Sequence, residues 1–382
     1  MKRCWLHIGM PKTGSTSIQV YLDKRTKRDD WEYISMGGAA STNREMHAMF
    51  GTRPEKWYWF AKRGESREKI AARGERMRAE LSKAIRDSDK QDIILSSESL
   101  SMIEKPGIVA LHGFLKEHFD EIRVLAYVRP PIGFMTSFFQ QRVKAGHGVF
   151  DFRPTLPCYR KRFRKFDMVF GRENVTLRKF DPASFPGGCI VADFCGLVGI
   201  APPAPGEVKR VNESLSREAC GMLYAYHKFG PGYGVGRNVI KENNRIIAPL
   251  LAMGGRKFKV ARSVAADWVD AADLEWMERR LGMKLAETAA EDGSEVTGEE
   301  DLLHISRASC LEFAANFQKM YGEAVPADAI PADDPVDPQA VASMIGRSRR
   351  IIRKQIRQGR GGPQEAPGLL GRIKSVVGRV FK

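Results

Sequence analysis

One stretch near the start of the chain restricts its fold more than any other. Beginning at residue 4 it reads CWLHIGMPKTGSTSIQ. The apolar run over residues 4–8 has the length of a buried strand, and the segment from Ser15 onward carries Ile18 and Leu22 four residues apart, as a helix with one buried side does. Residues 9–14 between them contain two glycines and a proline. The stretch therefore predicts a strand, a tight loop and a helix in direct succession.

The loop over residues 9–14 has the composition of a phosphate cradle. Glycines allow consecutive backbone N–H groups to face one ligand, and the start of the helix adds further N–H donors and the positive end of its dipole. The usual triphosphate loop, GxxxxGK[ST], has its lysine directly after the second glycine. Here Lys12 precedes Gly14, and no lysine follows. The candidate phosphate-binding residues are Pro11, Lys12, Thr13, Gly14, Ser15 and Thr16.

A second anion site is predicted around Arg129. Residues 121–128, EIRVLAYV, are mostly apolar and have the pattern of a buried strand, and Arg129 stands at its end. Two prolines and a predicted helix over residues 132–143 follow, with Ser137 eight positions after Arg129. A guanidinium group matches a phosphate bidentately, and a serine hydroxyl adds a neutral donor. Taken alone, Arg129 could equally be a charge at a strand end.

Glu98 directly follows another predicted strand, residues 92–97. Ligands of open parallel sheets bind outside the carboxyl ends of the strands, which is where Glu98 would lie. A carboxylate in a partly desolvated cleft can remove the proton of an attacking hydroxyl. The alternatives are that Glu98 caps the next helix or pairs with Lys12.

The segment GMPKTGSTSIQ, together with the Arg-x-Pro segment and its serine at an offset of eight, resembles the sulfotransferases that use 3′-phosphoadenosine 5′-phosphosulfate (PAPS). The resemblance implies an α/β, P-loop NTPase-like fold with a mainly parallel sheet. It implies that the first loop holds the 5′-phosphosulfate, that Arg129 and Ser137 bind the 3′-phosphate, and that Glu98 is the catalytic base. Where the family commonly has Asp after the arginine, this chain has Pro130. The resemblance covers about residues 3–220 and fades beyond them.

The expected activity is in-line transfer of the sulfuryl group of PAPS to a hydroxyl, on a carbohydrate or glycolipid acceptor. Lys12 is the second expected catalytic residue, and it would stabilise negative charge on the transferring group. We expect no metal, since Lys12 and Arg129 can supply the positive charge. Two other classes stay open. One is a nucleotide-dependent kinase, which the missing lysine after Gly14 disfavours; the other is a non-catalytic membrane-associated interaction protein with a nucleotide-binding fold.

The composition of the chain indicates its core size, its cysteine chemistry, its location and its partners. The chain has 382 residues, 43% of them hydrophobic, which is enough for a large core. Its six cysteines lack CxxC spacing, so neither a zinc site nor a disulfide framework is indicated. With no run of 18 apolar residues and no signal-peptide pattern, we expect a cytoplasmic protein. Nucleic acid is not an expected partner, because the basic and aromatic segment 159–170 puts its phenylalanines on one helical face.

The expected domain division is a sulfotransferase domain over residues 1–325, a Pro/Ala/Asp linker over 326–340 and a basic tail over 341–382. The net charge is +16, and the tail holds eleven Lys or Arg but only one acid. Its two parts, 341–356 and 369–381, are predicted basic amphipathic helices. They suit an anionic membrane surface, such as the inner membrane face; docking onto the protein's own body or a partner is the alternative.

Two further segments are interpreted from their composition alone. The aromatic residues 57–60 are either a lid that contacts the acceptor or a packing cluster beneath a loop. Residues 229–256, rich in Gly, Asn and Arg, are expected to form a surface loop.

Overall fold

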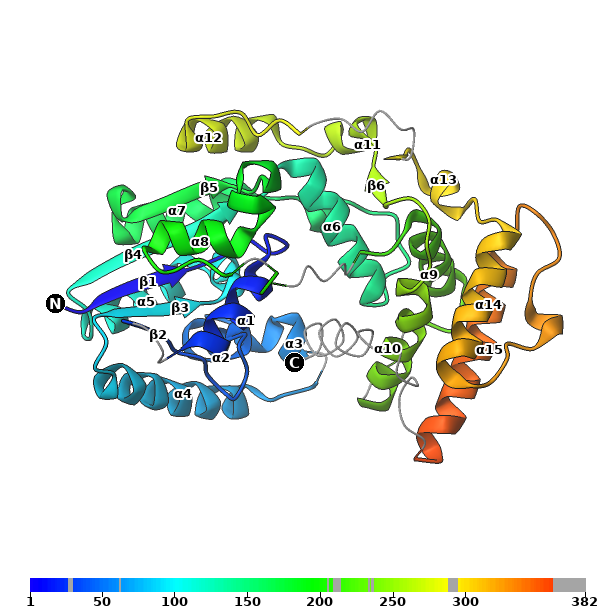
Figure 1. The fold of residues 1–382 in the computed structure, drawn as a ribbon, viewed down its shortest axis with the longest axis horizontal. Helices are drawn as coiled ribbons and strands as arrows, with labels where there is room; N and C mark the ends of the chain where they lie inside the picture. Colours follow the sequence, from blue (N-terminus) through cyan, green and yellow to red (C-terminus); the bar gives the residue numbers. More distant parts are fainter. Residues whose placement is uncertain are drawn as a thin grey trace. The chain divides into compact units, whose positions relative to one another are not determined.

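The structure is a computed structural model and describes residues 1–26, 30–61, 63–204, 206–208, 214–232, 234, 237–287 and 295–359. These residues divide into two compact units, each assembled from three pieces of chain. The described residues of 1–130, 157–210 and 270–286 form the first unit, and those of 131–156, 211–269 and 287–382 form the second. Figure 1 shows the sheet of the first unit and the helices of the second.

A five-stranded parallel sheet forms the centre of the first unit. Its strands are β1 (Arg3–His7), β2 (Trp31–Tyr33), β3 (Asp92–Ser96), β4 (Glu121–Val128) and β5 (Val175–Lys179). Their spatial order is β2-β3-β1-β4-β5, and every neighbouring pair is parallel. The predicted α/β fold with a mainly parallel sheet is therefore confirmed. The strand predicted over residues 121–128 matches β4 at both ends.

Both faces of the sheet are buried. Side chains alternate between the faces of a strand. In one row Leu6, Leu95 and Val124 lie side by side and are at most 1% exposed. On the other face Leu125 and Tyr127 belong to a cluster that also contains residues of α1 and α8. Strands covered on both faces are apolar almost throughout, which explains why β4 could be predicted from its sequence.

The helices of the first unit connect and cover these strands. They are α1 (Ser15–Arg25), α2 (Asn43–Phe50), α3 (Tyr58–Ala61), α4 (Arg67–Asp87), α5 (Lys105–Lys116), α7 (Tyr159–Phe170), α8 (Ile190–Val198) and α12 (Ala271–Leu281). The chain leaves β1 toward one edge of the sheet, where β2 lies, and leaves β4 toward the other, where β5 lies. The switch between β1 and β4 is the place where parallel sheets open a crevice at their carboxyl ends.

The aromatic residues 57–60 are mainly a packing cluster. Trp59 and Phe60 are 6% and 0% exposed and pack with Ala48 and Ile70. Trp57 stacks on the His47 ring at a centroid distance of 4.2 Å. The described structure therefore favours the packing interpretation over an acceptor-contacting lid for these rings. Tyr58, between them, remains 52% exposed.

The second unit is helical and is organised around α9 (Arg217–Phe229). Every residue from 219 to 226 is buried, so α9 is apolar on all sides, as a central helix must be. It contacts α6, α10, α13 and α15. The other elements of this unit are α6 (Pro131–Lys144), α10 (Arg237–Leu251), β6 (Lys259–Val260), α11 (Arg262–Ala266), β7 (Glu295–Val296), α13 (Glu299–Leu303), α14 (Arg307–Tyr321) and α15 (Pro338–Arg357).

The expectation of a surface loop over residues 229–256 is wrong. Helix α10 occupies most of the segment and buries Ile246, Ile247 and Leu250. Two polar side chains on the same helix, Glu242 and Asn243, are also buried, at 4% and 2% exposure. Because polar residues stand at buried positions, the helical pattern of apolar residues is interrupted in the sequence.

The segments expected as a linker, 326–340, and a tail, 341–382, belong in their described residues to the second compact unit, and the division at residue 325 stays a prediction. Val336 is 3% exposed, and its N–H donates to the carbonyl of Ile305 at 2.8 Å, so this segment packs on the second unit. The helix predicted over 341–356 is confirmed as α15, whose apolar side packs against α9 and α10. Met344 and Ile352 on that side are fully buried. The second predicted helix, 369–381, lies outside the described residues.

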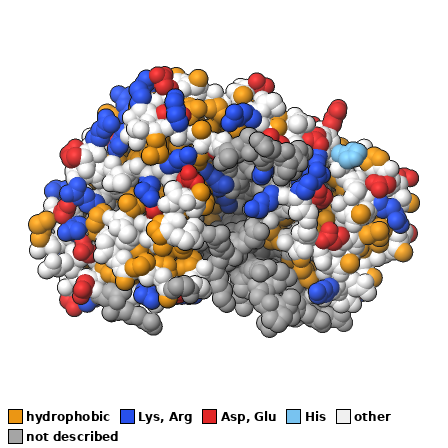
Figure 2. All heavy atoms as spheres, turned by 45° about the horizontal axis from the view of Figure 1, so that its top comes forward, with side chains coloured by type: hydrophobic (Ala, Val, Ile, Leu, Met, Phe, Trp, Pro, Cys, Tyr) orange, Lys and Arg blue, Asp and Glu red, His pale blue; other side chains and the backbone are white. Residues whose placement is uncertain are grey.

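The surface carries both signs of charge. On the face drawn in Figure 2, Lys and Arg side chains occur with Asp and Glu side chains among them. Among the described residues, no helix combines the length and the apolar character needed to cross a membrane.

Candidate active site

The loop after β1 bends through three residues in the left-handed backbone region. Gly9, Lys12 and Gly14 have φ angles of 61°, 70° and 76°. For a residue with a Cβ this conformation costs roughly 1–2 kcal/mol, so Lys12 holds backbone strain of the kind that concentrates at functional sites. Alternation of left- and right-handed residues turns successive N–H groups toward one side and makes an anion-binding concavity. Thr13 closes the turn, since its Oγ1 donates to the carbonyl of Met10 at 2.6 Å.

The start of α1 adds donors to this loop. The first backbone bonds of the helix run from the N–H groups of Ser17 and Ile18 to the carbonyl of Gly14, at 2.9 and 3.3 Å. The N–H groups of Ser15 and Thr16 therefore precede the helical ladder. The Ser15 hydroxyl is buried and has no hydrogen-bond partner among the described residues. A buried hydroxyl without a partner costs about 1–3 kcal/mol, which a bound anion would recover.

Glu98 lies directly against the loop. A Cβ built on Gly9 would stand 2.6 Å from the Cα of Glu98, so a residue larger than glycine would push the loop away from the end of β3. The N–H of Ser97 donates to the carbonyl of His7 at 2.9 Å and fixes the two strand ends together. The half-buried Glu98 begins a 3₁₀ helix, Glu98–Met102. The expected base and the expected phosphate loop are thus brought together at one edge of the sheet.

Arg129 joins the same edge from β4. Its Nη1 donates to the carbonyl of Lys12 at 2.6 Å, and its guanidinium lies 5.5 Å from the centroid of the Phe180 ring. The carbonyl of Arg129 accepts a hydrogen bond from the hydroxyl of Tyr159 at 2.7 Å. The side chain and the backbone of Arg129 are therefore both held. The contact with Lys12 also stabilises the strained turn of the loop.

The sequence analysis missed Asn43, which contacts Glu98. Its Nδ2 donates to Oε1 of Glu98 at 3.4 Å. Its Oδ1 accepts from Oγ of Ser97 at 2.9 Å and from the N–H of Ser99 at 3.2 Å, so the amide is fixed in one orientation. An N–H directed at a carboxylate favours the ionised form that a base needs. Asn43 begins α2, far from Glu98 in sequence, and no local pattern indicates the contact.

Tyr58 and Lys165 complete the surroundings of Glu98. Desolvation, and after it the Glu98 carboxylate, raise the pKa of Tyr58 to about 12 although the residue is half exposed. Lys165, at 8% exposure, donates from Nζ to the carbonyl of Ser101 at 2.8 Å, and the Ser101 hydroxyl donates to the carbonyl of Glu98 at 3.1 Å. Lys165 thus supports the short helix that begins with Glu98. Burial, followed by the charges of Arg162 and Lys161, lowers its pKa to about 7.

His7, just before the loop, is not suited to act as the base. It is 1% exposed, and its Nδ1 is hydrogen-bonded to Oγ of Ser96 at 2.8 Å. Burial lowers the pKa of His7 to about 4, because the buried imidazolium loses its hydration. At neutral pH it is an uncharged side chain beneath the loop.

Ser137 belongs to the second unit, where it lies half-buried on α6. Arg129 belongs to the first unit. Of the predicted site residues, the first unit therefore gathers the loop residues, Glu98 and Arg129, and Ser137 remains a predicted ligand.

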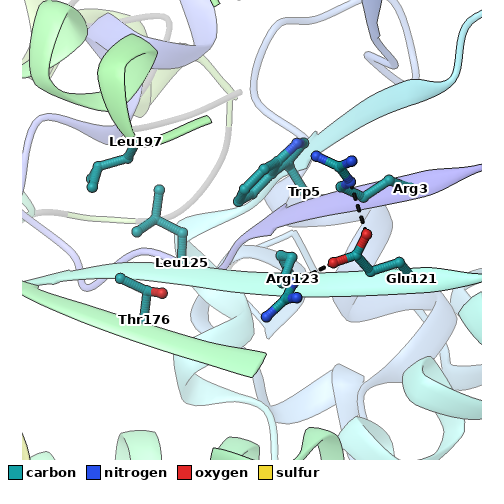
Figure 3. Close-up of a pocket in the computed structure, with 7 residues that line it drawn as sticks. All are labelled: Arg3, Trp5, Glu121, Arg123, Leu125, Thr176 and Leu197. Atoms are coloured by element: carbon teal, nitrogen blue, oxygen red, sulfur yellow. Dashed lines mark hydrogen bonds and ion pairs between the residues drawn. The ribbon is translucent and has the colours of Figure 1, made fainter. Parts of the chain in front are cut away.

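The pocket drawn in Figure 3 lies at the other end of the sheet. It measures about 340 Å³ and includes Arg3 and Glu121, the first residues of β1 and β4. Glu121 is paired with Arg3 at 2.9 Å and with Arg123 at 2.6 Å, as the dashed lines show. Ligands of parallel sheets bind at the carboxyl ends, so we assign the site to the loop and not to this pocket. Among the described residues, no three His, Cys, Asp or Glu side chains are grouped to hold a metal ion.

No family model matches the chain, and no curated protein matches its sequence. Two solved structures are similar to it. One is a sulfotransferase from Alicyclobacillus acidocaldarius, with a TM-score of 0.41 and 14% identity over 74% of this chain and 97% of that one. The other is the sulfotransferase domain from the curacin biosynthetic pathway, with a TM-score of 0.33 and 9% identity over 75% of this chain and 99% of that one. At this level of similarity, function has to be argued from the site itself.

Proposed function

We propose that this chain is a PAPS-dependent sulfotransferase. The observation that carries the proposal is the contact between Arg129 and the carbonyl of Lys12, because it places a guanidinium beside a loop shaped for an anion. PAPS carries anionic groups at both its 5′ and 3′ positions, and two neighbouring cationic groups suit such a donor. Lys12 stands before Gly14, where it is not in the position that the triphosphate loop gives its lysine.

In this proposal the loop and the start of α1 hold the 5′-phosphosulfate. Backbone N–H groups and the Ser15 hydroxyl bind its oxygens, and Lys12 stabilises the charge that grows on the departing phosphate. Arg129, with Ser137, binds the 3′-phosphate. The acceptor oxygen attacks sulfur in line as the bond between sulfur and the bridging phosphate oxygen breaks, and Glu98 takes the hydroxyl proton. The products are a sulfate ester and 3′-phosphoadenosine 5′-phosphate (PAP).

For the acceptor we propose a hydroxyl on a carbohydrate or glycolipid. Such hydroxyls are weak acids, so their attack needs a carboxylate base, and Glu98 held by Asn43 is suited to this task. The partly exposed Tyr58 beside it offers a ring edge and a hydroxyl to a polar acceptor.

The test is transfer of label from [³⁵S]PAPS to a panel of oligosaccharides, glycolipids, phenols and small alcohols, with the full-length protein. We expect label in a carbohydrate or glycolipid product, and loss of transfer in Glu98→Gln. Transfer to phenols alone would contradict the proposed acceptor class but not the activity. A parallel reaction with [γ-³²P]ATP covers the kinase alternative, and phosphorylation of the same panel without sulfation would overturn the sulfotransferase proposal.

A further inference from the structure

A cavity of about 700 Å³ lies in the second unit, and none of the residues of the candidate active site lines it. Its walls are the end of α9, the two residues that follow α9 and one side of α15. The volume is that of small-molecule sites, which run from about 300 to 1,000 Å³. The lining residues that decide its chemistry are Tyr226, Phe229, Gly346, Arg349, Arg350 and Arg353.

Helix α15 gives this cavity a regular wall. Its lining residues recur every three or four positions, so they form one stripe along the helix. Gly346 stands in the middle of the stripe, and a Cβ built there would meet no atom within 4 Å. A glycine inside a helix costs roughly 0.5–1 kcal/mol relative to alanine. Because Gly346 has no side chain, the middle of the cavity stays open.

Three guanidinium groups and a single carboxylate set the charge of the cavity. Nε of Arg349 and Nε of Arg353 donate to the two oxygens of Glu242, at 2.9 and 3.0 Å. Glu242 is 4% exposed, and no Asp or Glu is among the residues that line the cavity. Arg350 is exposed and has no hydrogen-bond or ion-pair partner among the described residues. The cavity therefore has an excess of positive charge.

The remaining walls are apolar or neutral. Phe229 is 39% exposed at one edge, and the Tyr226 hydroxyl accepts a hydrogen bond from Nη1 of Arg349 at 2.9 Å. The ion pairs hold Arg349 and Arg353 in fixed orientations, while the N–H donors of Arg350 are available to a ligand. Guanidinium groups suit the oxygens of a phosphate or sulfate, and an exposed ring suits the body of a small molecule.

We propose that this cavity binds a phosphate or sulfate monoester of about the size of a sugar. Such a ligand could be a free sugar ester or the headgroup of a lipid, and the ester group is common to both. The site lies within the second unit and does not depend on the proposed sulfotransferase activity.

The proposal is tested by calorimetric titration of the full-length protein with glucose 6-sulfate and glucose 6-phosphate, and with glucose as the neutral control. We expect saturable binding of one or both esters, at least tenfold tighter than that of glucose. Arg350→Ala should weaken binding about tenfold, the effect of losing a charged hydrogen bond. Gly346→Leu should also weaken ester binding, because the leucine side chain occupies the cavity while all three arginines are retained.

Two control variants make the test specific. Arg357→Ala removes the same charge from an exposed position on α15 outside the cavity and should leave the affinity unchanged. Lys12→Ala should leave it unchanged too, which separates this site from the loop after β1. Absence of ester binding, or equal losses in Arg350→Ala and Arg357→Ala, would overturn the proposal.

The source of the ester is decided with vesicles. Co-sedimentation with phosphatidylcholine vesicles containing phosphatidylinositol 4-phosphate, whose headgroup carries a phosphate monoester, is compared with phosphatidylcholine alone and measures headgroup binding. Sedimentation that falls in Arg350→Ala but not in Arg357→Ala identifies a lipid source, and equal sedimentation of the three proteins identifies a free ester.

Discussion

Two regions of this molecule, the loop edge with Arg129 and the cavity with Arg349 and Arg353, hold their arginines in opposite ways. At the carboxyl edge of the sheet, Arg129 donates to a backbone carbonyl, and the neighbouring backbone N–H groups of a strained loop are the proposed anion ligands. In the second unit, Arg349 and Arg353 share the buried carboxylate of Glu242. The proposed function of the first region depends on the conformation of its backbone, whereas the second region contains a buried ion pair that contributes to stability. Side-chain substitutions should therefore affect turnover in the first and folding in the second.

The largest effect is expected for Lys12→Ala. Removing one preorganised charge from the transferring group typically costs 10² to 10³ in rate, and we expect a loss of about a thousandfold in sulfuryl transfer. The melting temperature should change little, because Lys12 is only half-buried. The exposed Lys24→Ala on α1 is the matched control. A Lys12→Ala protein with more than a tenth of the wild-type rate would remove the lysine from the mechanism.

Glu242→Gln should give the opposite result. Breaking a buried ion pair by removing one partner typically costs about 3–5 kcal/mol, because Arg349 stays buried without its carboxylate. Urea unfolding should show a free energy of unfolding lower by about 3 kcal/mol, the lower end of this range, since glutamine still accepts one hydrogen bond. The exposed Glu300→Gln should stay within about 0.5 kcal/mol of wild type. Equal stability of the two variants would show that the pair is not a folding element.

Asn43→Ala should have a smaller effect, confined to the chemical step. We expect kcat to fall about tenfold, with the KM for PAPS unchanged, since Asn43 orients Glu98 and not the donor. Loss of the N–H that favours the carboxylate should also move the acid limb of the pH–rate profile to higher pH. If kcat falls while this limb stays in place, Asn43 has only a structural role.

The last prediction concerns the pH dependence of stability. Burial lowers the pKa of Lys165 to about 7 in the folded state, against 10.5 for the free side chain. The unfolded chain therefore binds more protons between these values, and the free energy of unfolding should rise with pH from about 7 to 10. Lys165→Met should flatten this rise, and the exposed Lys69→Met on α4 should not. Parallel pH profiles for wild type and Lys165→Met would contradict the assignment.

The sequence predicted what depends on short-range patterns. The strand, loop and helix over residues 4–25 follow from an apolar run, two glycines and a helical spacing, and the structure has them at the expected places. Strand β4 and helix α7 have the predicted bounds, since the strand is apolar over residues 124–128 and the helix has a clear apolar face. The placement of Arg129 and Glu98 beside the loop follows from a parallel sheet, in which carboxyl ends share an edge.

The sequence could not predict contacts between polar residues far apart. Glu242 lies on a helix that was expected to be a loop, and its partner Arg349 lies in a tail for which a membrane surface and docking onto the protein's own body were both open. In both segments a charged residue occupies a buried position, which a pattern of apolar and polar residues assigns to the surface. Asn43 was missed for a related reason, because it begins α2, whereas its partners Ser97 and Glu98 follow β3, more than fifty residues later.

The most direct measurement is thermal unfolding of the full-length protein with PAP, ATP or adenosine 5′-phosphosulfate, in wild type and in Arg129→Ala. A ligand at 100 times its Kd stabilises the fold by about 2.7 kcal/mol. We predict a clear rise in melting temperature with PAP in wild type, which Arg129→Ala largely abolishes. Stabilisation by ATP alone, or an unchanged response to PAP in Arg129→Ala, would contradict the assignment of a PAPS site at this edge of the sheet.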